Sequence, residues 1–162
     1  MLPSDLAAVS AIAARVHPDY PEDDAVFAER LALYPAGCFL LANGAEARGY
    51  LISHPWQFGR PPALNALLVA LPAPATTYYV HDLALLPDAR GSGAATAIVA
   101  TLIRHARARQ HHNISLVAVN NSVQFWQRHG FSILDDAALT AQLSSYDAQA
   151  RYLLRALDTP QR

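Results

Sequence analysis

The segment YYVHDLALLPDARGSGAA, from Tyr78 to Ala95, limits the folds open to this chain more than any other. Its first half is rich in aromatic and branched residues, which favour a half-buried β-strand. Pro87 has no backbone N–H to donate to a sheet, so the strand must end near it. From Ala94 to Arg109 apolar residues recur at helical spacing. The segment therefore predicts a strand, a tight turn and the start of a helix.

The turn in this segment has the composition of an anion-binding loop. Its glycines tolerate backbone angles that other residues avoid, and they leave room for a ligand. The first N–H groups of the following helix have no partner inside it, and with the helix dipole they attract a phosphate or pyrophosphate. An arginine adds a fixed positive charge. The residues of this expected site are Arg90, Gly91, Ser92, Gly93, Ala94 and Ala95.

Two nucleotide-binding loops have a similar glycine content, and this turn lacks an essential residue of each. A P-loop requires Gly-Lys-Ser/Thr, and the chain contains no lysine. A dinucleotide fingerprint requires a third glycine where this chain has Thr96, and it belongs to the first strand of its βαβ unit, whereas this turn lies past mid-chain. A strand-to-helix turn that binds nothing stays open, because a match to one short motif is only a hypothesis.

The rest of the chain predicts further helices and strands around this segment. Apolar periodicity indicates helices at 4–16 and from 22 onward, and another that ends at Gly130. Strands are expected at 38–42, 48–53, 114–119, 131–134 and 151–157, the first two joined by a turn at Asn43-Gly44. The proline-rich stretch 57–77 is too long for a hairpin turn and could contain a short helix at 64–71. A second short helix could form at 137–143. We expect the stretch 57–77 to cover a ligand pocket and to set which molecule is bound there.

Two segments together resemble the GNAT-type N-acetyltransferases. Residues 90–95 fit the motif R/Q-x-x-G-x-G/A, which in that family follows an apolar strand and a proline, as it does here. Residues 120–131, NNSVQFWQRHGF, are similar to a second segment, N-x-x-A-x-x-F-Y-x-x-x-G-F. The resemblance implies a single domain over 1–162 of the α/β class. Its mixed, mostly antiparallel central sheet would be splayed at the two central parallel strands, with helices on both faces.

The resemblance also implies an activity, the transfer of an acetyl group from acetyl-CoA to a primary amine of a small molecule or peptide. The pantetheine arm would pair with the backbone of Leu83, Ala84 and Leu85, where a backbone N–H would polarise the thioester carbonyl. The pyrophosphate would lie on residues 90–95. Further cofactor contacts are expected from Asn120, Asn121, Phe125 and Trp126.

Such a reaction needs a base, because the amine attacks in its neutral form. His81 and Asp82, on the strand before the glycine loop, are the candidates. Side chains alternate along a strand, so only one of the two is expected to face the cleft. His54 and Trp56 are expected in the acceptor pocket, where His54 is a third candidate base.

The second segment departs from the family at two positions. Counting back from Trp126 and Ser122 puts Val119 where the motif has asparagine, so Asn120 or Asn121 would take that place. Trp126 stands where the family often has a tyrosine that protonates the departing thiolate, so water, Tyr146 or Tyr152 would supply that proton here. The missing tyrosine keeps a second hypothesis open, a catalytically poor acyl-CoA-binding or regulatory module. A nucleotide-binding protein is the third hypothesis.

Charge and cysteine content limit the kinds of partner and the cellular compartment that we expect. The formal net charge of −1 supports neither nucleic acid nor a membrane surface as a partner. The acidic run Glu22-Asp23-Asp24 is expected to complement a helix dipole at the surface, although an acidic lip for a cationic amine stays open. One cysteine, Cys38, fits a reducing cytoplasm, and no signal peptide is expected. No metal is expected, and the apolar tail could pair two subunits into a homodimer.

Overall fold

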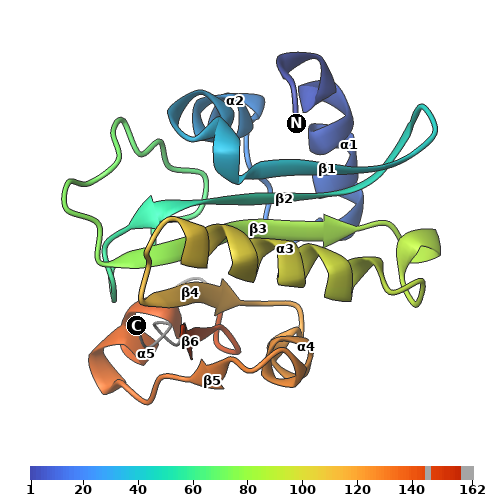
Figure 1. Ribbon diagram of the computed structural model, residues 1–162. Helices are drawn as coiled ribbons and strands as arrows, with labels where there is room; N and C mark the ends of the chain where they lie inside the picture. Colours follow the sequence, from blue (N-terminus) through green and yellow to red (C-terminus); the bar gives the residue numbers. More distant parts are fainter. Residues whose placement is uncertain (145–146, 158–162) are drawn as a thin grey trace.

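The computed structural model describes residues 1–144 and 147–157. These residues form a six-stranded sheet in the order β1-β2-β3-β4-β6-β5 (Figure 1). The strands are β1 (Cys38–Asn43), β2 (Glu46–Trp56), β3 (Thr77–Leu85), β4 (Asn113–Ala118), β5 (Ser132–Ile133) and β6 (Arg151–Ala156). β3 and β4 pair in parallel, and the other neighbouring strands pair antiparallel. The mixed, mostly antiparallel sheet predicted from the sequence is confirmed.

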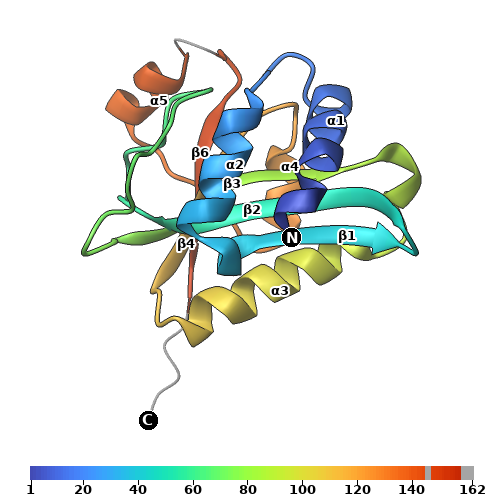
Figure 2. The same cartoon turned by 90° about the horizontal axis from the view of Figure 1, so that it is seen from above.

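Helices cover both faces of the sheet (Figure 2). They are α1 (Leu6–Val16), α2 (Asp24–Leu33), α3 (Ala94–Ala108), α4 (Val123–Arg128) and α5 (Ala137–Ser144), with single 3-10 turns at Pro3–Asp5, Pro35–Gly37 and Pro87–Ala89. α1 and α2 bury Val9 and Phe27 against one face, whereas α3 buries Leu102 against the other. In the described part of the chain, no helix is long and apolar enough to cross a membrane.

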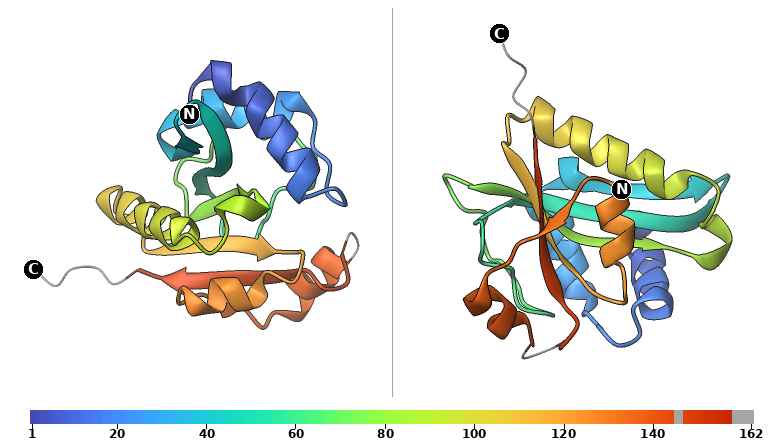
Figure 3. Two further views of the ribbon diagram at one scale, coloured as in Figure 1. Left: turned by 90° about the vertical axis from the view of Figure 1, so that its right-hand side faces the viewer. Right: turned by 90° about the horizontal axis from the view of Figure 1, so that it is seen from below.

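The two parallel strands separate along their length. β3 pairs with β4 only from Tyr78 to Val80, and the partners on β4 are Ile114 to Leu116. Beyond that point Leu83 to Leu85 pair with β2 alone, while the end of β4 pairs with β6. Figure 3 shows β4 and β6 running steeply across the direction of β1, β2 and β3. The splay expected between the central strands is therefore present, at the end of β3 that leads into the glycine loop.

A β-bulge interrupts β3 at His81. Ile52 on β2 pairs with Asp82, and the next residue, Ser53, pairs with Val80, so His81 has no partner on β2. An extra residue of this kind shifts the alternation of side chains by one position. The side chains of His81 and Asp82 therefore both point toward the face that α1 and α2 cover.

The loop between β2 and β3 does not contain the helix considered at 64–71. Asn65 and Val69 have left-handed backbone angles, with φ of +56° and +66°, which a right-handed helix excludes. The backbone N–H groups of Leu68 and Val69 donate to the Glu29 carboxylate of α2, each at 2.8 Å. The backbone of Leu68 and Val69 is therefore bonded to α2 and not arranged as a helix.

Candidate active site

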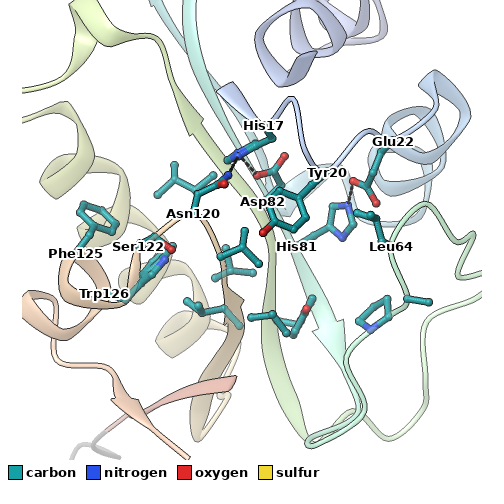
Figure 4. A pocket seen from close by; sticks show the side chains of 18 residues that line it. His17, Tyr20, Glu22, Leu64, His81, Asp82, Asn120, Ser122, Phe125 and Trp126 are labelled. Carbon is teal, nitrogen blue, oxygen red and sulfur yellow. Dashed lines mark hydrogen bonds and ion pairs between the residues drawn. The ribbon is translucent and has the colours of Figure 1, made fainter. Parts of the chain in front are cut away.

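A pocket of about 180 Å³ lies where β3 and β4 separate (Figure 4). Four parts of the chain form its wall: the α1–α2 connection, the loop before β3, the separated strands with the turn after β4, and α4 with its N-cap. In that order, the lining residues are His17, Tyr20, Glu22; Pro62, Ala63, Leu64; Tyr79, Val80, His81, Asp82, Leu83, Leu116, Val117, Val119, Asn120; Ser122, Phe125 and Trp126. Figure 4 shows Phe125 and Trp126 at one end and Glu22 and Leu64 at the other.

At the end of the pocket beside Glu22 and Leu64, the imidazole of His81 is paired with a carboxylate. His81 Nε2 lies 2.9 Å from Glu22 Oε2, and both side chains are 8% exposed. An ionised carboxylate only accepts hydrogen bonds, so we assign the proton to Nε2, and a neutral ring then keeps its lone pair on Nδ1. Burial raises the pKa of Glu22, but the contact with His81 and the Asn65 N–H outweigh it and hold that pKa below its usual value. The pair has the form of an imidazole base that is oriented by a carboxylate.

A second imidazole–carboxylate pair lies between the two ends. His17 Nε2 is 3.0 Å from Asp82 Oδ1, and the Tyr50 hydroxyl donates to Asp82 Oδ2 at 2.5 Å. Burial lowers the pKa of His17, but Asp82 outweighs it, so the pKa of His17 is raised above 6.5. Asn120 Nδ2 lies 3.0 Å from His17 Nδ1. His17 therefore connects β3 with the turn that follows β4.

The pocket contains two of the three predicted base candidates, His81 and Asp82. Strand alternation predicted that only one of His81 and Asp82 would face the cleft, and this expectation does not hold. The physical reason is the β-bulge at His81, which turns both side chains to the same face. The two carboxylates of the pocket, on Asp82 and Glu22, thus each lie next to a different histidine.

The two residues predicted for the acceptor pocket, His54 and Trp56, lie outside its lining. His54 is buried, and its ring packs against Trp56, Tyr79 and His81, which puts it behind the catalytic candidate. Burial lowers the pKa of His54 to about 3, so the ring is neutral at physiological pH. Trp56 Nε1 donates to the Arg60 carbonyl oxygen at 2.7 Å.

Of the two tyrosines considered as a proton source, Tyr152 does not line the pocket. Tyr152 is buried, and its hydroxyl accepts a hydrogen bond from the Gly59 N–H at 3.1 Å. Tyr146 lies outside the described residues. Of the other predicted cofactor contacts, Asn120, Phe125 and Trp126 line the pocket, whereas Asn121 does not.

The glycine loop at the start of α3 has open backbone donors. Gly91 and Gly93 have φ of +77° and +83°, and a Cβ on either one would meet open space. The N–H groups of five residues have no acceptor within the described part of the chain: Gly91, Ser92, Gly93, Ala95 and Thr96. Arg90 is exposed beside them, and its Nε donates to the Leu85 carbonyl oxygen at 3.3 Å. Unpaired donors, a helix N-terminus and a cation together fit a pyrophosphate.

Two contributors to the pocket were missed by sequence reasoning. His17 and Tyr20 lie in the connection between α1 and α2, which has no motif, and only their position after a helix end marks them. Glu22 was expected mainly as a surface carboxylate. It precedes the first turn of α2 and instead turns into the pocket. Within the described residues, no group of three metal-ligating side chains is present.

Comparisons with known proteins agree with the observed fold. The family model of the GNAT acetyltransferases matches residues 6–131. A search of curated sequences finds no match. Among solved structures, a GphF GNAT-like decarboxylase in complex with isobutyryl-CoA is similar, with a TM-score of 0.79, 16% identity, and coverage of 98% of this chain and 97% of that one.

Two further solved structures have the same fold. The ribosomal-protein-S18-alanine N-acetyltransferase from Escherichia coli has a TM-score of 0.67 and 15% identity, and the match covers 100% of this chain and 94% of that chain. Rv2747 from Mycobacterium tuberculosis, solved in complex with CoA, has a TM-score of 0.69 and 14% identity, with 96% and 95% covered. At these identities the likeness concerns the fold alone.

Proposed function

Because the chain belongs to the GNAT acetyltransferase family, we propose that it transfers an acetyl group from acetyl-CoA to a primary amine. One observation carries the proposal: the gap between β3 and β4 opens into a pocket that holds a carboxylate-paired histidine. The gap suits a narrow thioester arm, and the histidine suits the deprotonation of an amine. The reaction would take place in a ternary complex, by direct attack of the amine.

The chain offers two places to hold the cofactor. The five unpaired N–H groups between Gly91 and Thr96, with Arg90, would bind the pyrophosphate. The edge of Leu83 to Leu85 that faces β4 has no strand partner, so its backbone would pair with the pantetheine arm. Bound acetyl-CoA supplies an activated thioester carbonyl. A backbone N–H of Leu83 to Leu85 would stabilise the charge that develops on the carbonyl oxygen.

We assign the general base to His81. Its Nε2–H donates to Glu22, which fixes the ring and leaves Nδ1 free to take a proton from the incoming ammonium group. Asp82 is less suited to this role, because His17 and Tyr50 already engage both of its carboxylate oxygens. Glu22 is then a positioning residue, and it also favours the protonated ring that forms during the reaction.

The proton for the departing thiolate would come from water. Trp126 lines the pocket at the position of the family's tyrosine, and an indole N–H is not an acid at neutral pH. Its ring packs against Phe125 and Phe131, which fits a role in shaping the cofactor end of the pocket.

Two other functions compete with this one. The missing tyrosine favours a module that binds acyl-CoA and turns it over poorly. The GNAT-like decarboxylase of the same fold suggests a different reaction, the loss of CO₂ from a carboxylated acyl-CoA. We rank the decarboxylation lower, because a carboxylated acyl group would enter a pocket that already contains the carboxylates of Glu22 and Asp82.

The deciding experiment measures release of free thiol from acetyl-CoA with and without a panel of primary amines. Amine-dependent release, with an acetylated product in the mass spectrum, is the expected result. Saturable binding of acetyl-CoA with no release on any amine would instead favour the binding module. Release of CO₂ from malonyl-CoA without an amine would favour the decarboxylase.

A further inference from the structure

Among the described residues, no unpaired cation lines the pocket, either in its middle or at the end beside Glu22 and Leu64, where the acceptor would bind. Apart from tyrosines, the ionisable residues that line the pocket are His17, Glu22, His81 and Asp82. No arginine is among the lining residues that the structure describes, and the chain has no lysine. The two histidines lie against the two carboxylates, at 3.0 Å and 2.9 Å. Any positive charge on these rings is therefore already matched by a carboxylate.

Arg30 and Arg90 interact electrostatically with the lining residues Glu22 and His17, but neither arginine lines the pocket. The Arg30 side chain is 1% exposed and does not line the pocket; its guanidinium donates to Glu29 at 2.5 Å and to the Ala66 carbonyl oxygen at 2.7 Å. Arg90 lies at the glycine loop, where its Nε donates to the Leu85 carbonyl oxygen. An anionic group on the acceptor would thus meet two carboxylates and no free cation to neutralise it.

Apolar and aromatic side chains form the rest of this end of the pocket. Tyr79 comes from β3, and Pro62, Ala63 and Leu64 come from the loop before β3. Leu64 is 40% exposed, and Leu67, outside the lining, is 54% exposed, so apolar surface continues outward from the pocket.

This apolar rim is held in place by α2 and by the residues just before it. The Asn65 N–H donates to Glu22 Oε1 at 3.1 Å. The Asn65 side chain accepts the Asp23 N–H at 2.7 Å through Oδ1 and donates to Asp23 Oδ2 at 3.2 Å through Nδ2. The carboxylate of Glu29 accepts the N–H groups of Leu68 and Val69. The rim is therefore a fixed wall against which the body of an acceptor can pack.

We propose that the acceptor is a primary amine on an apolar body, with no carboxylate or phosphate next to the amine. The inference rests on the proposed function and adds a substrate class to it. An ammonium group that leaves water for this pocket gains the carboxylates of Glu22 and Asp82. A carboxylate that enters the same pocket loses its hydration with no compensating partner, and that cost is large.

Three acceptors that share one apolar body test the proposal: phenethylamine, phenylalaninamide and phenylalanine. Because the added groups alter the amine's own pKa, each kcat/KM is calculated per concentration of neutral amine. We expect the first two to react and phenylalanine to react about 100-fold more slowly or worse than its amide. Calorimetry on the CoA-saturated protein, where no turnover occurs, should give the same order of affinities.

A variant with one added positive charge separates the electrostatic cause from shape. Leu64→Arg places a guanidinium at the rim of the pocket and should narrow the amide-to-acid ratio about tenfold. Leu67→Arg adds the same charge to the same loop, outside the pocket lining, and should leave the ratio within about twofold.

A wrong substrate class and a wrong function would give different results. Phenylalanine that reacts as well as its amide would overturn the substrate class, while the transfer reaction itself would stand. Strong activity on anionic amines with none on phenethylamine would overturn it equally. If no amine of any class supports thiol release, the proposed function fails, and the inference fails with it.

Discussion

His81 Nε2 lies 2.9 Å from Glu22 Oε2, although the two residues are 59 positions apart in the chain. The contact joins β3, which leads into the glycine loop, to the start of α2. The apolar rim of the pocket is hydrogen-bonded to α2 and to the residues just before it. The residue proposed as the base is thus fixed by the same segment that would position the proposed acceptor. Each part of this arrangement can be tested separately.

The first prediction concerns the base. His81→Ala should lower kcat/KM for an amine by about 10²–10⁴-fold, the usual range for loss of a positioned base. The affinity for acetyl-CoA, measured by calorimetry, should stay within about twofold, because His81 does not touch the glycine loop. His112→Ala removes an exposed histidine away from the pocket and should have no effect on either quantity. Full activity of His81→Ala from pH 6 to 9 would refute the assignment.

The second prediction concerns the titration of His17. Its pKa lies above 6.5 because Asp82 outweighs burial. In Asp82→Asn the attraction is gone while burial remains, so the pKa of His17 should fall below 6.5. Proton NMR of the imidazole across pH 4.5–9 measures both values directly. A His17 resonance that titrates at the same pH in the two proteins would contradict the ion pair.

The same pair predicts a dependence of stability on pH. A histidine whose pKa is raised on folding stabilises the protein fully below its ordinary pKa of 6.5, and this stabilisation is lost as the pH rises through the folded value. The difference in unfolding free energy between wild type and Asp82→Asn should therefore be larger at pH 5.5 than at pH 8. Urea unfolding at the two pH values measures it, and a difference that grows with pH would have the wrong sign.

The fourth prediction concerns the glycine loop. Gly93→Ala forces a β-carbon into a left-handed conformation, which costs about 1–2 kcal/mol of stability, and it should weaken acetyl-CoA binding at least tenfold. Gly44→Ala is the matched control, since Gly44 has φ of +61° and open surroundings in the β1–β2 turn. It should lose similar stability and keep its affinity. Equal losses of affinity in both variants would show that the effect comes from stability alone.

The fifth prediction concerns the rim. In Glu29→Gln one carboxylate oxygen becomes an NH₂ group that cannot accept the N–H of Leu68 or Val69, so the loop loosens from α2. We expect kcat/KM for the amine to fall about tenfold, with unchanged affinity for acetyl-CoA. Glu46→Gln, on the exposed end of β2, is the control. Unaltered amine kinetics in Glu29→Gln would show that the rim does not depend on this bond.

The sequence predicted the strand, the turn and the helix start around the glycine loop, for a local reason. The donors of a glycine loop belong to consecutive residues, so Gly91 and Gly93 identify it without knowledge of the rest of the fold. Hydrophobic periodicity likewise predicted α1 and α3. These features depend on neighbours in the chain, which a sequence displays directly.

The acceptor side could not be predicted in the same way, because it depends on distant contacts. The bulge at His81 exists only in the pairing of β3 with β2, and nothing in β3 alone marks it. The residues 64–71 have helical composition, but Glu29 and Arg30 bond their backbone instead. His17 entered the site because α1 ends where β3 passes, which is a property of the packing.

The most direct test of the proposed cofactor site is a titration of ¹⁵N-labelled protein with CoA, followed by NMR of the backbone amides. We predict that the largest saturable shifts occur at Gly91 to Thr96 and at Leu83 to Leu85, with smaller shifts around Asn120. Saturable binding that leaves the amides of Gly91 to Thr96 unmoved would contradict this site, because the cofactor would then lie somewhere other than at the start of α3.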